Sequence, residues 1–189
     1  MAAIDAGVRM IGENRPQEVV AKAEGLMARC GERGFALGVA DDAGASTIAG
    51  EHIPFHLIGQ LQSNKIGKVL PVVNTIESVD SLDLAEKISR RAVARGITVG
   101  VLLEVNESGE ASKSGCDPSH AIRIAQKIGT LDGLELQGLM TTGAHVDDET
   151  AIRKGLATLS TTREHILESG APGTHTTCDL SRATNGAME

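Results

Sequence analysis

The stretch PFHLIGQLQSNK, residues 54–65, decides the fold of this chain because it joins a short strand, a turn and the beginning of a helix. Three apolar residues enclose His56 in a run that proline precedes and glycine follows, which is typical of a strand buried on both faces. Ser63 predicts a helix start, because its hydroxyl can cap the backbone and apolar residues follow at helical spacing. The segment therefore predicts one strand-then-helix unit of an α/β fold.

Ligand sites in parallel α/β folds lie where strands end and helices begin. Four polar side chains fall at that junction in this segment, and they are His56, Gln60, Ser63 and Asn64. We therefore expect one edge of a binding site here.

Strand-then-helix units recur along the chain. The strongest strand signal is ITVGVLLEV, residues 97–105, which is β-branched, apolar and long enough for a central strand. We expect about six units in all, with strands near residues 8–11, 55–58, 72–76, 97–105, 134–141 and 174–180. Strict alternation predicts a parallel sheet. Periodicity alone leaves a closed barrel and an open doubly wound sheet as alternatives.

The composition fits such a fold and argues against several classes of partner. Of 189 residues, 41% are hydrophobic and two are phenylalanines, with no tyrosine or tryptophan, so the core must be mainly aliphatic. A net charge of −7 and a pI near 5.4 argue against nucleic acid and anionic membranes as main partners. The first residues have neither the basic nor the long apolar segment of a signal peptide or membrane span.

Cysteines and histidines carry little functional signal. Cys30, Cys116 and Cys178 are far apart and odd in number, which predicts reduced thiols in a cytoplasmic protein. The histidines show no metal-binding spacing, so no metal site is predicted.

Four motifs together resemble a known family. They are IGEN at residues 11–14, HLIGQLQSNK at 56–65, SKSG at 112–115 and GLM at 138–140. In this order they resemble the pyridoxal-phosphate homeostasis protein family, whose members look like the barrel domain of alanine racemase without its second domain. The resemblance implies an α/β fold of the (β/α)8 TIM-barrel type, in a cytoplasmic protein with a single domain over residues 1–189 that binds pyridoxal phosphate.

The same resemblance implies an incomplete barrel, with about six of the eight strand-helix units. The family holds its cofactor as a Schiff base on a first-strand lysine, in a run resembling AVSK, and closes with a strand carrying Arg, Gly and Thr. Neither strand is found here, and LSRATNGAME at residues 180–189 departs from the family's approximate LSMGMSGDME. We therefore expect a domain truncated at both ends, with unpaired outer strands and no catalytic residue.

Four cofactor-binding residues are predicted from the family pattern: Asn14, His56, Met140 and Ser181. Each has a plain structural alternative. Asn14 could be a turn residue, His56 a core histidine and Met140 a core methionine. Ser181 is the best phosphate contact, with an ordinary helix cap as its alternative.

Two lysines are possible substitutes for the absent Schiff-base lysine. Lys65 is expected in the first turn of a helix and Lys113 in a long exposed loop. Neither position offers the desolvated pocket that lowers the pKa of a reactive lysine, so both are interpreted as surface residues.

The leading functional hypothesis is a cofactor carrier without a reaction of its own, which buffers pyridoxal phosphate for enzymes that depend on it. We expect cofactor binding to be impaired if the two strands are missing. One alternative is a racemase-like barrel enzyme, although the chain offers no second domain to supply a second base. Another alternative is a remnant that binds nothing.

Overall fold

The centre of the molecule is a parallel sheet that curves in one direction. The structure is a computed structural model that describes residues 2–38, 51–110, 113–143, 148–170 and 184–185. The sheet order is β1-β4-β5-β6-β7-β8, with the strands β1 (Ile11–Glu13), β4 (Phe55–Leu57), β5 (Thr75–Val79), β6 (Val99–Glu104), β7 (Leu134–Thr141) and β8 (Thr184–Asn185). Since β1 and β8 are the two ends of this order, the described strands form an open arc.

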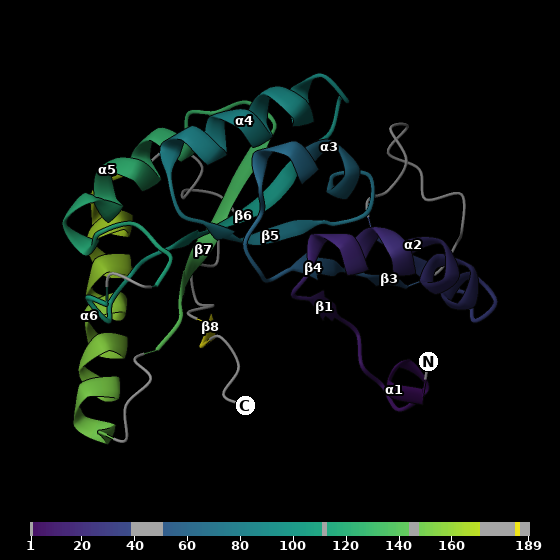
Figure 1. Cartoon of the computed structure of the whole chain (residues 1–189), viewed down its shortest axis with the longest axis horizontal. Helices are drawn as coiled ribbons and strands as arrows, with labels where there is room; N and C mark the ends of the chain where they lie inside the picture. Colours follow the sequence, from purple (N-terminus) through teal and green to yellow (C-terminus); the bar gives the residue numbers. More distant parts are fainter. Residues whose placement is uncertain (1, 39–50, 111–112, 144–147, 171–183, 186–189) are drawn as a thin grey trace.

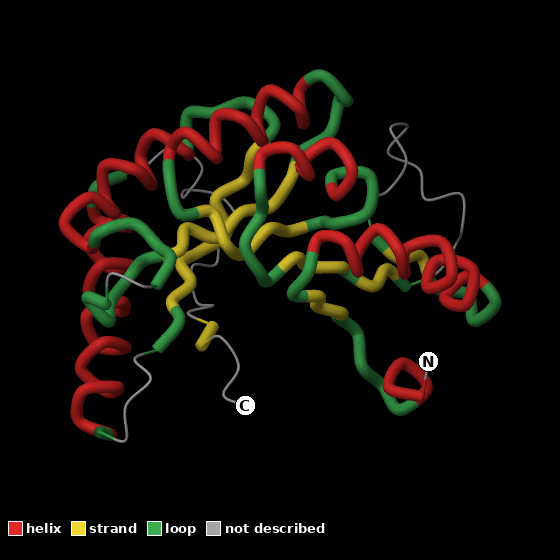
Figure 2. Tube along the Cα trace, viewed as in Figure 1, coloured by secondary structure: helices red, strands yellow, loops and turns green. Residues whose placement is uncertain are grey.

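The helices lie along the convex side of this arc (Figure 1), and Figure 2 shows the strands on the inner side of the helices. They are α2 (Pro16–Gly31), α3 (Ile66–Val69), α4 (Leu82–Val93), α5 (Pro118–Ile128) and α6 (Glu149–Glu168). A short helix α1 (Ala2–Asp5) precedes β1, a 3-10 turn η1 (Ser63–Lys65) precedes α3, and β2 (Ala36–Leu37) pairs with β3 (His52–Ile53) in a separate small sheet.

Side-chain caps fix where three of the long helices begin. The hydroxyl of Ser81 accepts from the backbone N–H of Leu84 at α4, and Asp117 accepts from Ser119 at α5. Asp148 accepts from the first turn of α6. Each cap satisfies backbone N–H donors that the helix itself leaves without a partner. The residue at which each of these helices begins is therefore well defined.

The outer face of the sheet builds the hydrophobic core. Fully buried strand residues on it include Phe55, Leu57, Ile76, Val101 and Leu103. They form one cluster with apolar residues of the helices, which confirms a core made mainly from aliphatic side chains. This packing holds the strands in place while their other face remains available for polar side chains.

The predicted fold class is confirmed, with local differences. Parallel strands alternate with helices in an arc that is not closed among the described residues. The strand expected at 72–76 begins later, at Thr75, and the strand expected at 174–180 lies outside the described residues. The prediction that Ser63 caps a helix was wrong, because Ser63 lies inside the 3-10 turn, where no side-chain cap is made.

Candidate functional site

The concave face of the sheet carries polar side chains that bond to one another. Nδ1 of His56 on β4 lies 2.7 Å from Oε1 of Glu77 on β5, and both residues are buried. Thr75 donates to Oε1 of Gln137 at 3.1 Å, although these residues lie two strands apart. Buried polar groups need such partners, because each unpaired one costs about 1–3 kcal/mol. The inner face is therefore an ordered polar surface.

A glycine on the intervening strand makes the longer of these bridges possible. Gly100 lies on β6 beside Thr75, and a Cβ built on it would overlap the side-chain amide of Gln137. The amide group of Gln137 thus crosses β6 where that strand has no side chain. Any larger residue at position 100 must displace it.

A second group of contacts joins the carboxyl ends of the strands, and we call it the rim. Nε2 of Gln60 donates to Oε2 of Glu104 at 2.6 Å, and the hydroxyl of Ser78 donates to the carbonyl of Gly59 at 2.7 Å. The backbone and side-chain oxygens of Asn14 lie so close to Gly59 that a Cβ there would overlap them. The turn at Gly59 and Gln60 is therefore held by contacts with Asn14 on one side and with Ser78 and Glu104 on the other.

Glu104 is the most deeply buried charged group of the rim. Only 3% of its surface is exposed, and it lies beside Met140 in the register of β6 and β7. Burial raises the pKa of Glu104, the hydrogen bond from Gln60 opposes this, and the nearby charge of Asp80 raises it further. The rim thus places a carboxyl group with a raised pKa next to an apolar methionine.

The predicted site residues are only partly brought together. Asn14 directly follows β1 and is exposed at the rim, whereas His56 lies on the neighbouring strand β4 and is buried on the inner face. Met140 is buried at the end of β7. Ser181 lies outside the described residues. Their role in binding a cofactor stays a prediction.

None of the described strands carries a lysine. Lys65 is half-buried at the end of η1. Lys113 is less exposed than expected: 16% of its side chain is accessible, and its ammonium group bonds to the carbonyl of Gly143 and lies 3.1 Å from Glu110. The interpretation of Lys113 as a freely solvated side chain was therefore wrong, because its loop folds back toward the end of β7.

The side chains of the inner face are of the chemical types that pyridoxal phosphate needs around its ring. His56, Gln60 and Glu104 offer donors and acceptors to a pyridine ring and its hydroxyl, and Met140 offers an apolar surface. The chemical types of these side chains therefore suit a pyridine ring. The phosphate partner predicted from the sequence is Ser181, so the described residues account for the ring side of such a site.

Sequence reasoning missed two of the polar residues that organise this face. Glu104 and Gln137 were interpreted only as parts of apolar strands. A charged or amide side chain inside an apolar strand indicates a buried polar group, and buried polar groups normally have hydrogen-bond partners. This signal could have identified both residues.

The part of the chain that the structure describes has no cluster of three or more metal-ligating side chains. It also contains no helix that is long and apolar enough to cross a membrane.

The chain is similar to proteins of known sequence over its whole length. A family model described as alanine racemase, N-terminal domain, matches residues 1–188. A pyridoxal phosphate homeostasis protein of Helicobacter pylori strain J99 is 41% identical over 133 residues, covering 68% of this chain and 60% of the relative. One of Vibrio alginolyticus is 32% identical over 188 residues, covering 100% and 71%. The chain thus spans 60% of the length of the Helicobacter pylori relatives.

Solved structures show the same fold. A protein of Bifidobacterium adolescentis, described as unknown, is 82% identical with a TM-score of 0.84, covering 92% of this chain and 66% of the other. PipY of Synechococcus elongatus with pyridoxal phosphate bound is 25% identical with a TM-score of 0.70, covering 91% and 70%. An alanine racemase of Clostridium difficile is 18% identical with a TM-score of 0.59, covering 86% and 46%, a likeness of fold alone.

Three findings indicate the same family. They are the family model that matches residues 1–188, the similar relatives and the arc of parallel strands. The chain belongs to the alanine racemase N-terminal domain family and, within it, to the pyridoxal phosphate homeostasis proteins.

Proposed function

We propose that this chain binds pyridoxal phosphate at the rim of its inner face and serves as a cofactor carrier without a reaction of its own. The observation that carries the proposal is the position of this face. It is the polar, concave side of a sheet whose fold matches PipY, a protein whose structure contains the same cofactor. Parallel α/β folds bind ligands at the carboxyl ends of their strands, which is where the rim lies.

Each predicted contact has a distinct part in this proposal. Asn14 reaches the ligand from the end of β1, because Gly59 leaves room for it. His56 is held by Glu77 through one ring nitrogen, so its orientation is fixed before a ligand arrives. Met140 provides an apolar surface beside the ring, and Ser181 binds the phosphate. Orienting side chains in advance lowers the entropic cost of binding.

The carrier role rests on the relatives, which are named pyridoxal phosphate homeostasis proteins. The contacts proposed for the described residues are noncovalent, because no described strand holds a lysine. Enzymes that depend on pyridoxal phosphate are the proposed recipients. The cytoplasm is the proposed compartment, and the buried, unbonded thiols of Cys30 and Cys116 are consistent with reducing conditions.

Equilibrium dialysis against pyridoxal phosphate tests the proposal. We expect saturable binding by the chain, and we expect Asn14→Ala to weaken it about 3- to 10-fold, the effect of one lost hydrogen bond. Gln126→Ala is a matched control, because it removes an amide from α5 on the convex side. Absence of binding by the unaltered chain, or equal loss in both variants, would contradict the proposal.

A further inference from the structure

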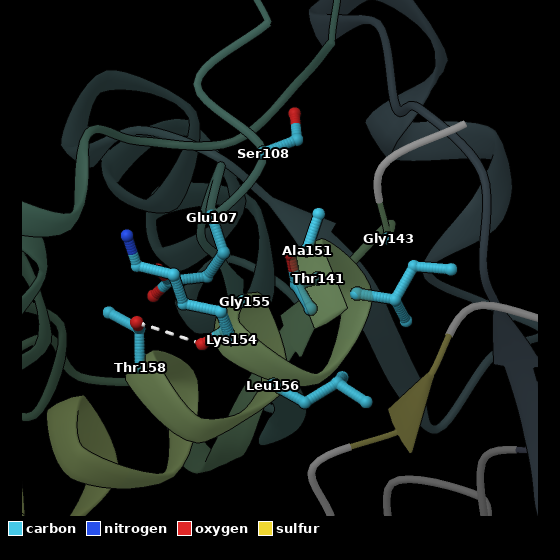
Figure 3. Close-up of a pocket in the computed structure, with 10 residues that line it drawn as sticks. Glu107, Ser108, Thr141, Gly143, Ala151, Lys154, Gly155, Leu156 and Thr158 are labelled. Atoms are coloured by element: carbon cyan, nitrogen blue, oxygen red, sulfur yellow. Dashed lines mark hydrogen bonds between the residues drawn. The ribbon is translucent and has the colours of Figure 1, made fainter. Parts of the chain in front are cut away.

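A separate cavity of about 240 Å³ lies between the loop that follows β6 and helix α6. Figure 3 shows the side chains that line it. Glu107 and Ser108 come from the loop, Thr141 from the end of β7, and Lys154 and Thr158 from α6. One water molecule needs only about 10–15 Å³. The cavity therefore has room for a small organic molecule.

Glu107 has a carboxylate oxygen without a partner. Its Oε1 is inaccessible to solvent and makes no hydrogen bond in the described structure. Burial raises the pKa of Glu107, and the neighbouring charge of Asp117 raises it further. The loop does not use this group for its own folding, because Ser108 bonds to Asn106 and Asn106 bonds to the carbonyl of Glu110 instead. A cationic hydrogen-bond donor would satisfy the unpaired oxygen.

The hydroxyls of the lining are available only as acceptors. Thr141 donates its proton to the carbonyl of Val105 at 2.7 Å, and Thr158 donates to the carbonyl of Lys154 at 3.0 Å, the bond drawn in Figure 3. Each hydroxyl keeps free lone pairs after this bond. Together with Glu107, these hydroxyls give the lining several acceptors for an ammonium group.

Lys154 supplies the opposite charge. Among the residues that the structure describes, it is the only basic one that lines the cavity, and it forms no ion pair with any of them. Two apolar side chains of the same helix, Ile152 and Leu156, complete the lining. A ligand that satisfies every group would carry an ammonium, a carboxylate and a short apolar body.

We propose that this cavity binds a small zwitterionic α-amino acid, with its ammonium on Glu107 and its carboxylate on Lys154. The side chain of the ligand lies against Ile152 and Leu156. This site is distinct from the rim, because it lies between a loop and α6 rather than among the inner-face side chains. It does not depend on pyridoxal phosphate binding, and either proposal can fail without the other.

Isothermal titration of the chain with L-valine, isobutylamine and isovalerate tests the proposal. These ligands share the four carbons of an isobutyl group and differ in which charged groups they carry. We expect L-valine to bind with a Kd of about 1 mM or tighter, and each single-charge analogue to bind at least 10-fold more weakly. No binding of L-valine, or equal binding of isobutylamine, would overturn the proposal.

Variants then assign the contacts. We expect Glu107→Gln and Lys154→Met each to weaken L-valine binding at least 10-fold, and Lys127→Met on α5 to leave it unchanged. Thr158→Val provides a variant on an exposed helix position, where misfolding is not expected, and should weaken binding about 3-fold. Thermal melts establish that each variant is folded.

Pyridoxal phosphate dialysis of the same variants separates the two proposals. We expect Glu107→Gln to bind the cofactor as the unaltered chain does. If L-valine fails to bind and Lys154→Met lowers the melting temperature, Lys154 and Glu107 pair with each other in solution, and the amino-acid site is refuted.

Discussion

The two faces of the central sheet differ in what they contribute. The convex face carries side chains such as Leu103 and Val101, which no solvent reaches and which pack under the helices. The concave face carries His56, Thr75 and Glu77, which are also buried but have hydrogen-bond partners: His56 pairs with Glu77, and Thr75 donates to Gln137. Side chains alternate between these faces along each strand.

This difference separates stability from ligand binding. Apolar burial stabilises by about 1.5–3 kcal/mol for each large side chain. A buried hydrogen bond contributes about 0.5–1.5 kcal/mol. The convex face should therefore set the free energy of unfolding, while the concave face fixes which polar groups a ligand meets. Substitutions on each face measure this division.

The largest effect is expected on the convex face. Leu103→Ala removes a fully buried side chain from the central strand, which should lower the free energy of unfolding by about 2–5 kcal/mol. Chemical denaturation measures the loss. Val93→Ala is a control at an apolar but exposed position on α4, where 54% of the residue is accessible, and should change stability by less than about 0.5 kcal/mol. Equal losses in both variants would mean that the core is not packed as described.

A smaller effect is expected where the concave face is sterically tight. Gly100→Ala places a Cβ against the side chain of Gln137 and should cost about 1–3 kcal/mol by overpacking and by loss of the bond to Thr75. In the Gln137→Ala background the same substitution should cost much less. If the two losses are additive, the side chain of Gln137 does not cross β6.

The pattern of apolar residues predicted the convex face better than the concave one. Alternating strands and helices depend on local periodicity, so the strand at 97–105 and the helix that Asp117 begins could be located from sequence. The polar pairs join residues 21, 44 and 62 positions apart. Sequence periodicity contains no information about such pairs.

Short elements were also difficult to predict. The segment from Ser63 was expected to begin a regular helix, but it forms a 3-10 turn and then the single-turn helix α3. Tertiary contacts decide such short segments, because a single turn has little intrinsic stability. Strand ends could be located approximately from sequence, which places Asn14 just after β1 and Met140 near the end of β7, while the role of both residues in binding stays a prediction.

The pair of His56 and Glu77 should respond less strongly than Gly100. Glu77→Gln preserves the shape and an acceptor oxygen but removes the charge, so one charge-assisted hydrogen bond becomes a neutral one. The difference is about 1 kcal/mol. Denaturation of Glu77→Gln, His56→Leu and the double variant isolates the coupling between the two residues. A coupling energy near zero would show that the 2.7 Å contact contributes nothing to stability.

The smallest effect is expected from the charge of Glu104, and it should appear only as a dependence on pH. Burial raises the pKa of Glu104 above its ordinary value of 4.5 in the folded chain, so the folded state holds this proton more tightly than the unfolded state. The resulting stabilisation is complete below pH 4.5 and is lost as the pH rises through the raised pKa. Glu104→Gln keeps an acceptor for Gln60 but cannot ionise. The variant should therefore match the unaltered chain at pH 4 and exceed it in stability at pH 8. Denaturation curves measured between these pH values provide the comparison, and Glu86→Gln on the surface of α4 should leave the pH profile unchanged. A Glu104→Gln variant that loses stability equally at every pH would show that the carboxyl group acts through the shape of its contact with Gln60 and not through its proton.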